Sequence, residues 1–163
     1  MTKRKSLIFM TFLIASLAPA KAFATDASTT DPSAVSIWEE APDTIFDARD
    51  VDLEAFKWIA RPVIVFADAP LDPAYREQIE LLNERMNELA KRDVVVIVDT
   101  APADRTEIRT KLRPRGFMLT VVSKEGQVIL RKPFPWDVRE LSRSIDKLPI
   151  RKQEIRDSVS SVE

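Results

Sequence analysis

Two short apolar runs separated by one amphipathic segment constrain the fold more than any other feature of this sequence. Val63–Phe66 and Val94–Val98 are rich in β-branched residues, as expected for strands that are covered on both faces. Between them, apolar residues recur every three or four positions from Tyr75 to Leu89, which predicts an amphipathic helix of about five turns. A strand, a helix and a second strand in this order predict a right-handed parallel βαβ unit.

The junction between the first strand and this helix carries its own local signals. Asp68-Ala-Pro70 interrupts the apolar run, and Asp72-Pro73 supplies an N-cap acid followed by a proline at the first helical position. In α/β sheets, ligands bind preferentially where strand ends meet helix starts. We therefore expect any functional surface to include the segment 61–75.

The rest of the chain continues the same alternation of elements. The patterns predict a short helix or turn near 52–59, a helix at about 103–112, strands at 117–122 and 127–131 joined by a turn at 123–126, and a last helix at about 137–148. Two strands so close in sequence pair antiparallel. The prediction is an α/β fold with the element order of a thioredoxin-like three-layer domain, βαβ-α-ββ-α, with a four-stranded mixed sheet and an N-terminal helical extension.

The N-terminal residues have the order of a secretory signal peptide. Basic residues 3–5 precede an apolar run over 7–18, and small residues follow. Cleavage after Ala22 or after Ala24 fits the small-residue pattern, and we favour Ala24. The alternative is a retained membrane anchor, but the run is short for a span and Pro19 follows it. We expect a periplasmic or secreted protein, with no stable membrane insertion after cleavage.

These patterns divide the chain into four parts. They are a signal peptide (1–24), a flexible or loosely packed N-terminal segment (25–51), the thioredoxin-like domain (52–150) and a charged C-terminal tail (151–163). Beyond Pro149, Ile150 and Ile155 are the residues able to hold the tail to the domain.

The absence of two residue types excludes several kinds of chemistry. The sequence contains no Cys and no His, which rules out a disulfide, a thiol nucleophile, a dithiol redox centre and an imidazole base. From Thr25 onwards, 21 basic residues face 26 acidic ones, a net charge of −5 that argues against nucleic acid or an anionic membrane as the main partner. No cofactor is expected, and a metal ion would have to be a hard cation held by oxygen ligands.

Four stretches make the chain resemble a known family. They are FKWIARPVIVFADAPLDPAYREQ, the strand at 93–99, RGFMLTVVSKEGQVILR and LPIRKQEIR. Over about 52–156 the sequence is similar to a family of exported bacterial proteins catalogued as domain of unknown function 4174, which is grouped with thioredoxin-like proteins. The resemblance implies a fold and an export route, and no activity.

Comparison with active thioredoxins indicates what this chain lacks. Their Cys-x-x-Cys pair lies between the first strand and the first helix, a place occupied here by 68–72. Their cis-proline aligns with Met118, in a segment similar to 115–118. The resemblance therefore implies a redox-inactive relative, and peroxiredoxin or glutathione-transfer chemistry that needs a cysteine is excluded as well.

The loops at this end of the predicted sheet contain the candidate binding residues. They are Asp68, Asp72, Tyr75, Arg115 and Met118. A purely structural interpretation of three of them is simpler: Asp72 is an N-cap, Asp68 forms a turn, and Arg115 is their surface salt-bridge partner. A basic cluster at 111–115 and an aromatic ledge at 134–136 are weaker signals, and each has a structural explanation.

Two functional hypotheses remain open. The favoured one is a non-catalytic module that binds a periplasmic protein or a small ligand through the loops 68–75 and 115–118. The alternative is an enzyme assisted by carboxylates or a divalent cation, using Asp68, Asp72 and Asp99. The two differ in a physical respect, because an enzyme site requires these acids to lie close together and partly buried.

Overall fold

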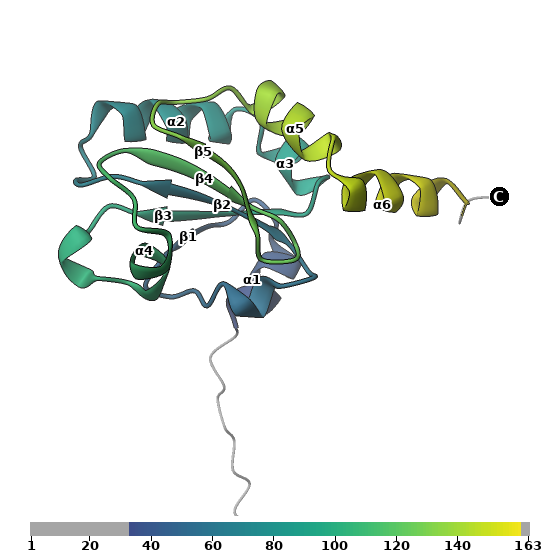
Figure 1. The fold of residues 1–163 in the computed structure, drawn as a ribbon, viewed down its shortest axis with the longest axis horizontal. Helices are drawn as coiled ribbons and strands as arrows, with labels where there is room; N and C mark the ends of the chain where they lie inside the picture. Colours follow the sequence, from purple (N-terminus) through teal and green to yellow (C-terminus); the bar gives the residue numbers. More distant parts are fainter. Residues whose placement is uncertain (1–32, 161–163) are drawn as a thin grey trace, which may run out of the picture. The chain divides into compact units, whose positions relative to one another are not determined.

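The computed structural model describes residues 33–160, which form a mixed five-stranded sheet with helices on both faces (Figure 1). The strands are β1 (Ile45–Asp47), β2 (Arg61–Phe66), β3 (Val94–Asp99), β4 (Met118–Val122) and β5 (Val128–Lys132). Their spatial order is β1-β3-β2-β4-β5. The first three strands are mutually parallel, whereas β4 runs antiparallel to β2 and β5 antiparallel to β4. The α/β class, the mixed sheet and the parallel βαβ unit are confirmed.

Helices cover both faces of the sheet, and the last helix extends beyond it (Figure 1). They are α1 (Ala34–Glu40), α2 (Pro73–Asn83), α3 (Met86–Ala90), α4 (Glu107–Leu112), α5 (Val138–Asp146) and α6 (Pro149–Ser160), with 3-10 turns at Glu54–Phe56 and Pro102–Asp104. In Figure 1, α2, α3 and α5 lie on one side of the sheet, and α1 and α4 lie on the other.

Each face of the sheet has its own apolar core. Because side chains alternate along a strand, Val63 and Val65 face the core under α2, α3 and α5, whereas Ile64 and Phe66 face the core under α1 and α4. All of β2 is buried. This central position explains why its sequence is continuously apolar after the first two residues.

The predicted number of strands is wrong, since the sheet has a fifth strand, β1. It comes from the segment 25–51, for which the sequence predicts loose packing, and it pairs in parallel with β3. Phe46 of β1 and Trp38 of α1 are buried in the core, and the Trp38 indole N–H donates to the Val94 carbonyl at 3.1 Å. Three residues are too few to show a strand periodicity, so the pattern could not reveal β1.

Several helix boundaries differ from the sequence prediction. The predicted five-turn helix is two helices, because α2 ends at Asn83 and α3 begins at Met86. The segment near 52–59 contains only a 3-10 turn. In the segment 103–112, α4 begins later than predicted because Thr106 caps it, accepting the Arg109 backbone N–H at 3.1 Å.

The described part of the charged C-terminal tail is helical. Polar contacts of Arg151 and Glu154 connect α6 to the domain, whereas Ile155 is exposed. The predicted signal peptide and its cleavage site lie outside the described residues. Across 33–160, no helix combines the length and apolar character needed to cross a membrane.

Candidate functional site

The loops that contain the candidate residues meet at one end of the sheet. Phe66, the last residue of β2, is in register with Asp99 of β3 and with Met118 of β4. Leu119 is in register with Lys132, so β5 also ends there. The loops 67–72, 113–117 and 133–137 therefore form one surface, which we call the loop surface.

A buried ion pair lies beneath the loop surface. The Asp99 carboxylate, whose side chain is 1% exposed, accepts hydrogen bonds from Arg109 Nε at 3.0 Å and from the Thr106 hydroxyl at 2.7 Å. Arg109 Nη2 donates to the carbonyls of Ala67 at 2.7 Å and Asp99 at 2.9 Å. Arg109 thus joins the ends of β2 and β3.

The same guanidinium group reaches towards Asp68. Arg109 Nη1 lies 3.7 Å from Asp68 Oδ1, which is an ion-pair distance but too long for a hydrogen bond, and the Asp68 side chain is exposed. Arg109 also lies over the Phe66 ring, 5.5 Å from its centroid. The expected salt bridge between Asp68 and Arg115 is therefore wrong, because Arg109 is the cation beside Asp68.

Asp72 and Tyr75 have a local structural connection. Asp72 is the N-cap of α2, as predicted, and it accepts the Tyr75 backbone N–H at 3.1 Å. The Tyr75 ring packs partly buried against the core under α2. Burial raises the pKa of the Tyr75 phenol, and the nearby Asp47 carboxylate raises it further. Tyr75 is therefore a neutral hydrogen-bonding group at neutral pH.

The other two candidate residues have different surroundings. Met118 packs partly buried against the core under α1 and α4. Arg115 is exposed, and it has no ion pair or hydrogen bond with another residue in the described part of the chain. The structure therefore brings together Asp68 with Arg109 and Asp72 with Tyr75, and it leaves Arg115 available at the surface.

Two large apolar side chains are exposed on the loop surface. Leu71 is 78% exposed and Phe134 is 52% exposed. The Lys132 ammonium group lies 4.5 Å from the Trp136 ring centroid and 5.8 Å from that of Phe134. The buried Gln78 amide holds this ledge in place, because it accepts the Trp136 backbone N–H at 2.8 Å and donates to the Trp136 carbonyl at 3.1 Å.

Sequence reasoning did not select Arg109 or Thr106 for this end of the sheet. A signal was available, because Asp99 ends a buried apolar run and a buried carboxylate needs a cation or several donors.

The acids at this end have structural partners: Asp99 is bound by Arg109 and Thr106, and Asp72 caps α2. Within 33–160, no group of three or more acidic side chains is arranged to hold a metal ion.

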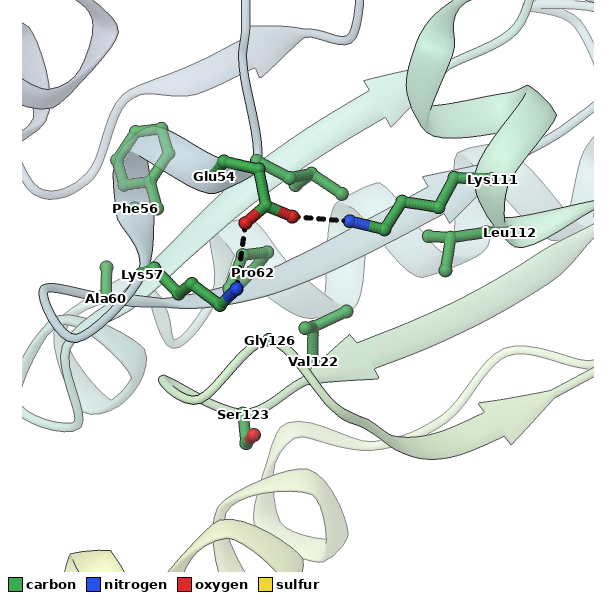
Figure 2. Close-up of a pocket in the computed structure, with 11 residues that line it drawn as sticks. Glu54, Phe56, Lys57, Ala60, Pro62, Lys111, Leu112, Val122, Ser123 and Gly126 are labelled. Atoms are coloured by element: carbon green, nitrogen blue, oxygen red, sulfur yellow. Dashed lines mark hydrogen bonds and ion pairs between the residues drawn. The ribbon is translucent and has the colours of Figure 1, made fainter.

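A small hollow lies between the Glu54–Phe56 turn, α4 and the β4–β5 turn (Figure 2). Glu54 spans it, accepting hydrogen bonds from Lys111 at 2.6 Å and Lys57 at 2.9 Å. These hydrogen bonds lower the pKa of Glu54 to about 2. The hollow encloses about 20 Å³, which is room for about one water molecule and too small for an organic ligand.

Comparisons with known proteins identify the family and the fold. Residues 52–154 match the family model described as "Domain of unknown function (DUF4174)". Among curated proteins, no match is found. Thioredoxin peroxidase I of Plasmodium yoelii is similar in structure, with 14% identity, a TM-score of 0.50, and coverage of 63% of this chain and 80% of that protein.

The mitochondrial 2-Cys peroxiredoxin of Plasmodium falciparum also matches, with 17% identity, a TM-score of 0.45, and coverage of 72% of this chain and 90% of that one. The similarity to the Plasmodium yoelii protein confirms the predicted thioredoxin-like fold. Thiol chemistry does not accompany the fold, because this sequence contains no cysteine.

Proposed function

We propose that this chain, which belongs to the DUF4174 family, is an exported thioredoxin-like protein that binds a protein or a small ligand without catalysing a reaction. The proposed binding site is the loop surface, with Asp68, Leu71, Arg115 and Phe134 as its accessible side chains. The export part of the proposal is supported by the signal-peptide pattern of residues 1–24.

One observation carries the binding proposal: Leu71 and Phe134 are exposed at the same end of the sheet as the unpaired Arg115. Exposing large apolar side chains to water is unfavourable, and a partner that covers them removes this cost. Aromatic residues and arginine are the types enriched at the centre of protein interfaces. The two hydrogen bonds of Gln78 hold the Trp136 backbone in the segment 134–136, which lowers the conformational entropy that this segment loses on binding.

The state of the polar groups supports binding over catalysis. With neither Cys nor His in the sequence, thiol and imidazole chemistry are excluded, and the acids at this end of the sheet are the catalytic candidates that the sequence indicates. Asp99 is saturated by Arg109 and Thr106, and Asp72 is engaged as a cap. No observation on the described residues favours an enzyme assisted by carboxylates or a divalent cation, so we propose no second function.

Site-specific photo-crosslinking in the producing cell tests the protein-partner form of the proposal. A photoreactive amino acid placed at Leu71 or Phe134 should give discrete adducts with a defined partner. The matched control is Val159 on α6, which is also apolar and exposed but lies outside the loop surface. Adducts at position 71 should weaken when Arg115 is replaced by Glu, since this reverses a charge on the proposed binding surface.

The small-ligand form of the proposal is tested by thermal unfolding with a metabolite panel. A ligand at 100 times its Kd stabilises by about 2.7 kcal/mol, which raises Tm by several degrees. Identical adducts at positions 71 and 159, together with no ligand-induced shift, would refute the binding proposal. Cell fractionation and N-terminal sequencing test export, where we expect a mature protein that starts at Thr25.

A further inference from the structure

The strand β5 forms one edge of the sheet. It pairs with β4 and has no strand on its other side. Outside this pairing, no backbone group of Val128–Lys132 makes a hydrogen bond with the rest of the described chain. Successive residues of an antiparallel strand direct their N–H and C=O groups to alternate sides, so β5 has a row of unpaired backbone groups along its outer side.

The side chains of β5 are arranged in the same way on both faces of the sheet. Leu130 and Lys132 are in register with residues of the core under α2, α3 and α5, so they lie on that face. Val128 and Arg131 lie on the face of α1 and α4, by the same comparison with β4 and β2. Each face of the edge therefore has an apolar residue first and a cation after it.

The first half of β5 can contact further apolar side chains. Val128 is 41% exposed, and Ile129 and Leu130 are half-buried. Val128 and Ile129 also line an open cleft of about 310 Å³, to which the apolar residues 148–150 contribute. Apolar side chains placed beside this half would remove exposed apolar surface from water, which is favourable.

The second half of β5 carries two cations without acidic partners. Among residues 33–160, no carboxylate lies within ion-pair distance of Arg131 or Lys132. The Arg131 guanidinium donates to the Leu112 carbonyl at 2.6 Å, and the Lys132 ammonium group lies over the Trp136 ring. Both contacts are with neutral groups, so each cation can still pair with a carboxylate.

The acids nearest along the chain are placed elsewhere. Glu125 lies in the turn before β5, at the end of the strand away from the two cations. Asp137 caps α5, where it accepts the Arg139 backbone N–H at 2.6 Å. The neighbouring strand β4 contains no charged residue. A carboxylate that pairs with Arg131 or Lys132 would therefore come from another molecule.

We propose that β5 is a docking edge for an extended segment of a partner protein, which adds a sixth strand to the sheet. The segment has apolar side chains beside Val128–Leu130 and acidic side chains beside Arg131 and Lys132. Backbone hydrogen bonds supply affinity, and cross-strand pairs select the sequence. This edge is separate from the loop surface, so the proposal does not depend on the proposed function.

A second copy of the chain fits this edge less well than an acidic segment does. β5 contains no acidic residue, so two copies that pair through β5 give neither Arg131 nor Lys132 a carboxylate. Charged residues on an edge strand also oppose its pairing with identical strands. The opposite edge of the sheet, β1, has only three residues and offers fewer backbone groups.

Backbone amide NMR titration of the purified protein with a synthetic peptide tests the proposal. The probe is acetyl-Glu-Glu-Val-Val-Val-amide, whose order matches an antiparallel sixth strand, and the reversed order Val-Val-Val-Glu-Glu tests the parallel alternative. It should perturb the amides of β5 and slow their hydrogen exchange, and it should leave those of β1 unchanged. Five residues bind weakly, so the titration extends to about 20 mM.

Two altered peptides separate the backbone contribution from the charge contribution. A peptide with N-methyl groups on alternate residues keeps the side chains but loses backbone donors, and it should not bind. Replacing both glutamates by lysine should weaken binding at least about tenfold, because each favourable charge pair contributes about threefold and like charges repel.

Substitution of Arg131 tests the charge pairing from the side of the protein. Arg131→Gln should weaken binding of the glutamate peptide about threefold, and Arg131→Lys should largely restore it. The same Arg131→Gln change should leave binding of Gln-Gln-Val-Val-Val unaltered. Arg49→Gln is the matched control, since it removes an exposed arginine beside β1, at the other edge of the sheet.

Each outcome supports or overturns the proposal. Perturbation of β5 that is lost with the N-methylated peptide and weakened by Arg131→Gln supports it. Equal binding of the N-methylated peptide would overturn strand addition, and equal binding of the lysine peptide would overturn the acidic partner. Concentration-dependent changes in β5 without any peptide would assign the edge to a second copy instead. Unchanged β5 signals at about 20 mM peptide would overturn the proposal altogether.

Discussion

Replacing Arg109 by Met should destabilise the fold strongly, because Arg109 is the cation that compensates the buried Asp99. The Arg109 side chain is 11% exposed and that of Asp99 is 1% exposed, so water screens the pair poorly. Methionine has a similar length and can still cover the Phe66 ring, over which the guanidinium lies. The substitution therefore removes mainly charge and hydrogen bonds.

The magnitude follows from the groups that lose a partner. Removing one member of a buried ion pair costs about 3–5 kcal/mol, because it leaves the other charge uncompensated. The carbonyls of Ala67 and Asp99 also lose a donor, but the Asp99 carboxylate keeps the Thr106 hydroxyl. We expect a loss of about 3–4 kcal/mol in the free energy of unfolding, a large share of the ~5–15 kcal/mol typical of a domain.

Urea unfolding at neutral pH, followed by tryptophan fluorescence, measures this loss. Arg115→Met is the matched control, since it makes the same chemical change on an exposed side chain and should cost less than about 0.5 kcal/mol. In a double-mutant cycle with Asp99→Asn, the two costs should be non-additive by about 2 kcal/mol. A loss below about 1 kcal/mol for Arg109→Met, or additive costs, would refute this account of the pair.

Two further predictions concern single side chains. Carboxyl NMR should show that Glu54 titrates at about pH 2, and Lys111→Met should move this midpoint upwards, because the Lys111 hydrogen bond is the largest cause of the low pKa. Because the pKa of Glu54 in the folded protein lies below the ordinary value of 4.5, the contribution of Glu54 to stability is complete above about pH 4.5 and is lost as the pH falls through 2. A titration midpoint near pH 4 for Glu54 would contradict this prediction. Gln78→Met should lower the free energy of unfolding in urea by about 1–3 kcal/mol and accelerate hydrogen exchange at the Trp136 amide, because both backbone groups of Trp136 lose their partner. An unchanged exchange rate would show that the Gln78 hydrogen bonds do not hold Trp136 in place.

The parts of the fold that the sequence predicted are those whose information is local. β2 and β3 are almost entirely buried, so their apolar runs are continuous and unmistakable. The Asp72 cap of α2 depends on a contact only three residues along the chain. The order of strands and helices then follows from general rules of connection, which require no knowledge of individual contacts.

The parts that it missed depend on contacts between distant residues. β1 has three residues and is defined by its pairing with β3. The Arg61 side chain meets Glu154, which lies 93 positions further along the chain, so nothing near Arg61 indicates that it is buried. The sequence does not indicate the role of Arg109 for the same reason, since its contact with Ala67 spans 42 positions. Polar residues reveal their role only when the partner that justifies their burial is known.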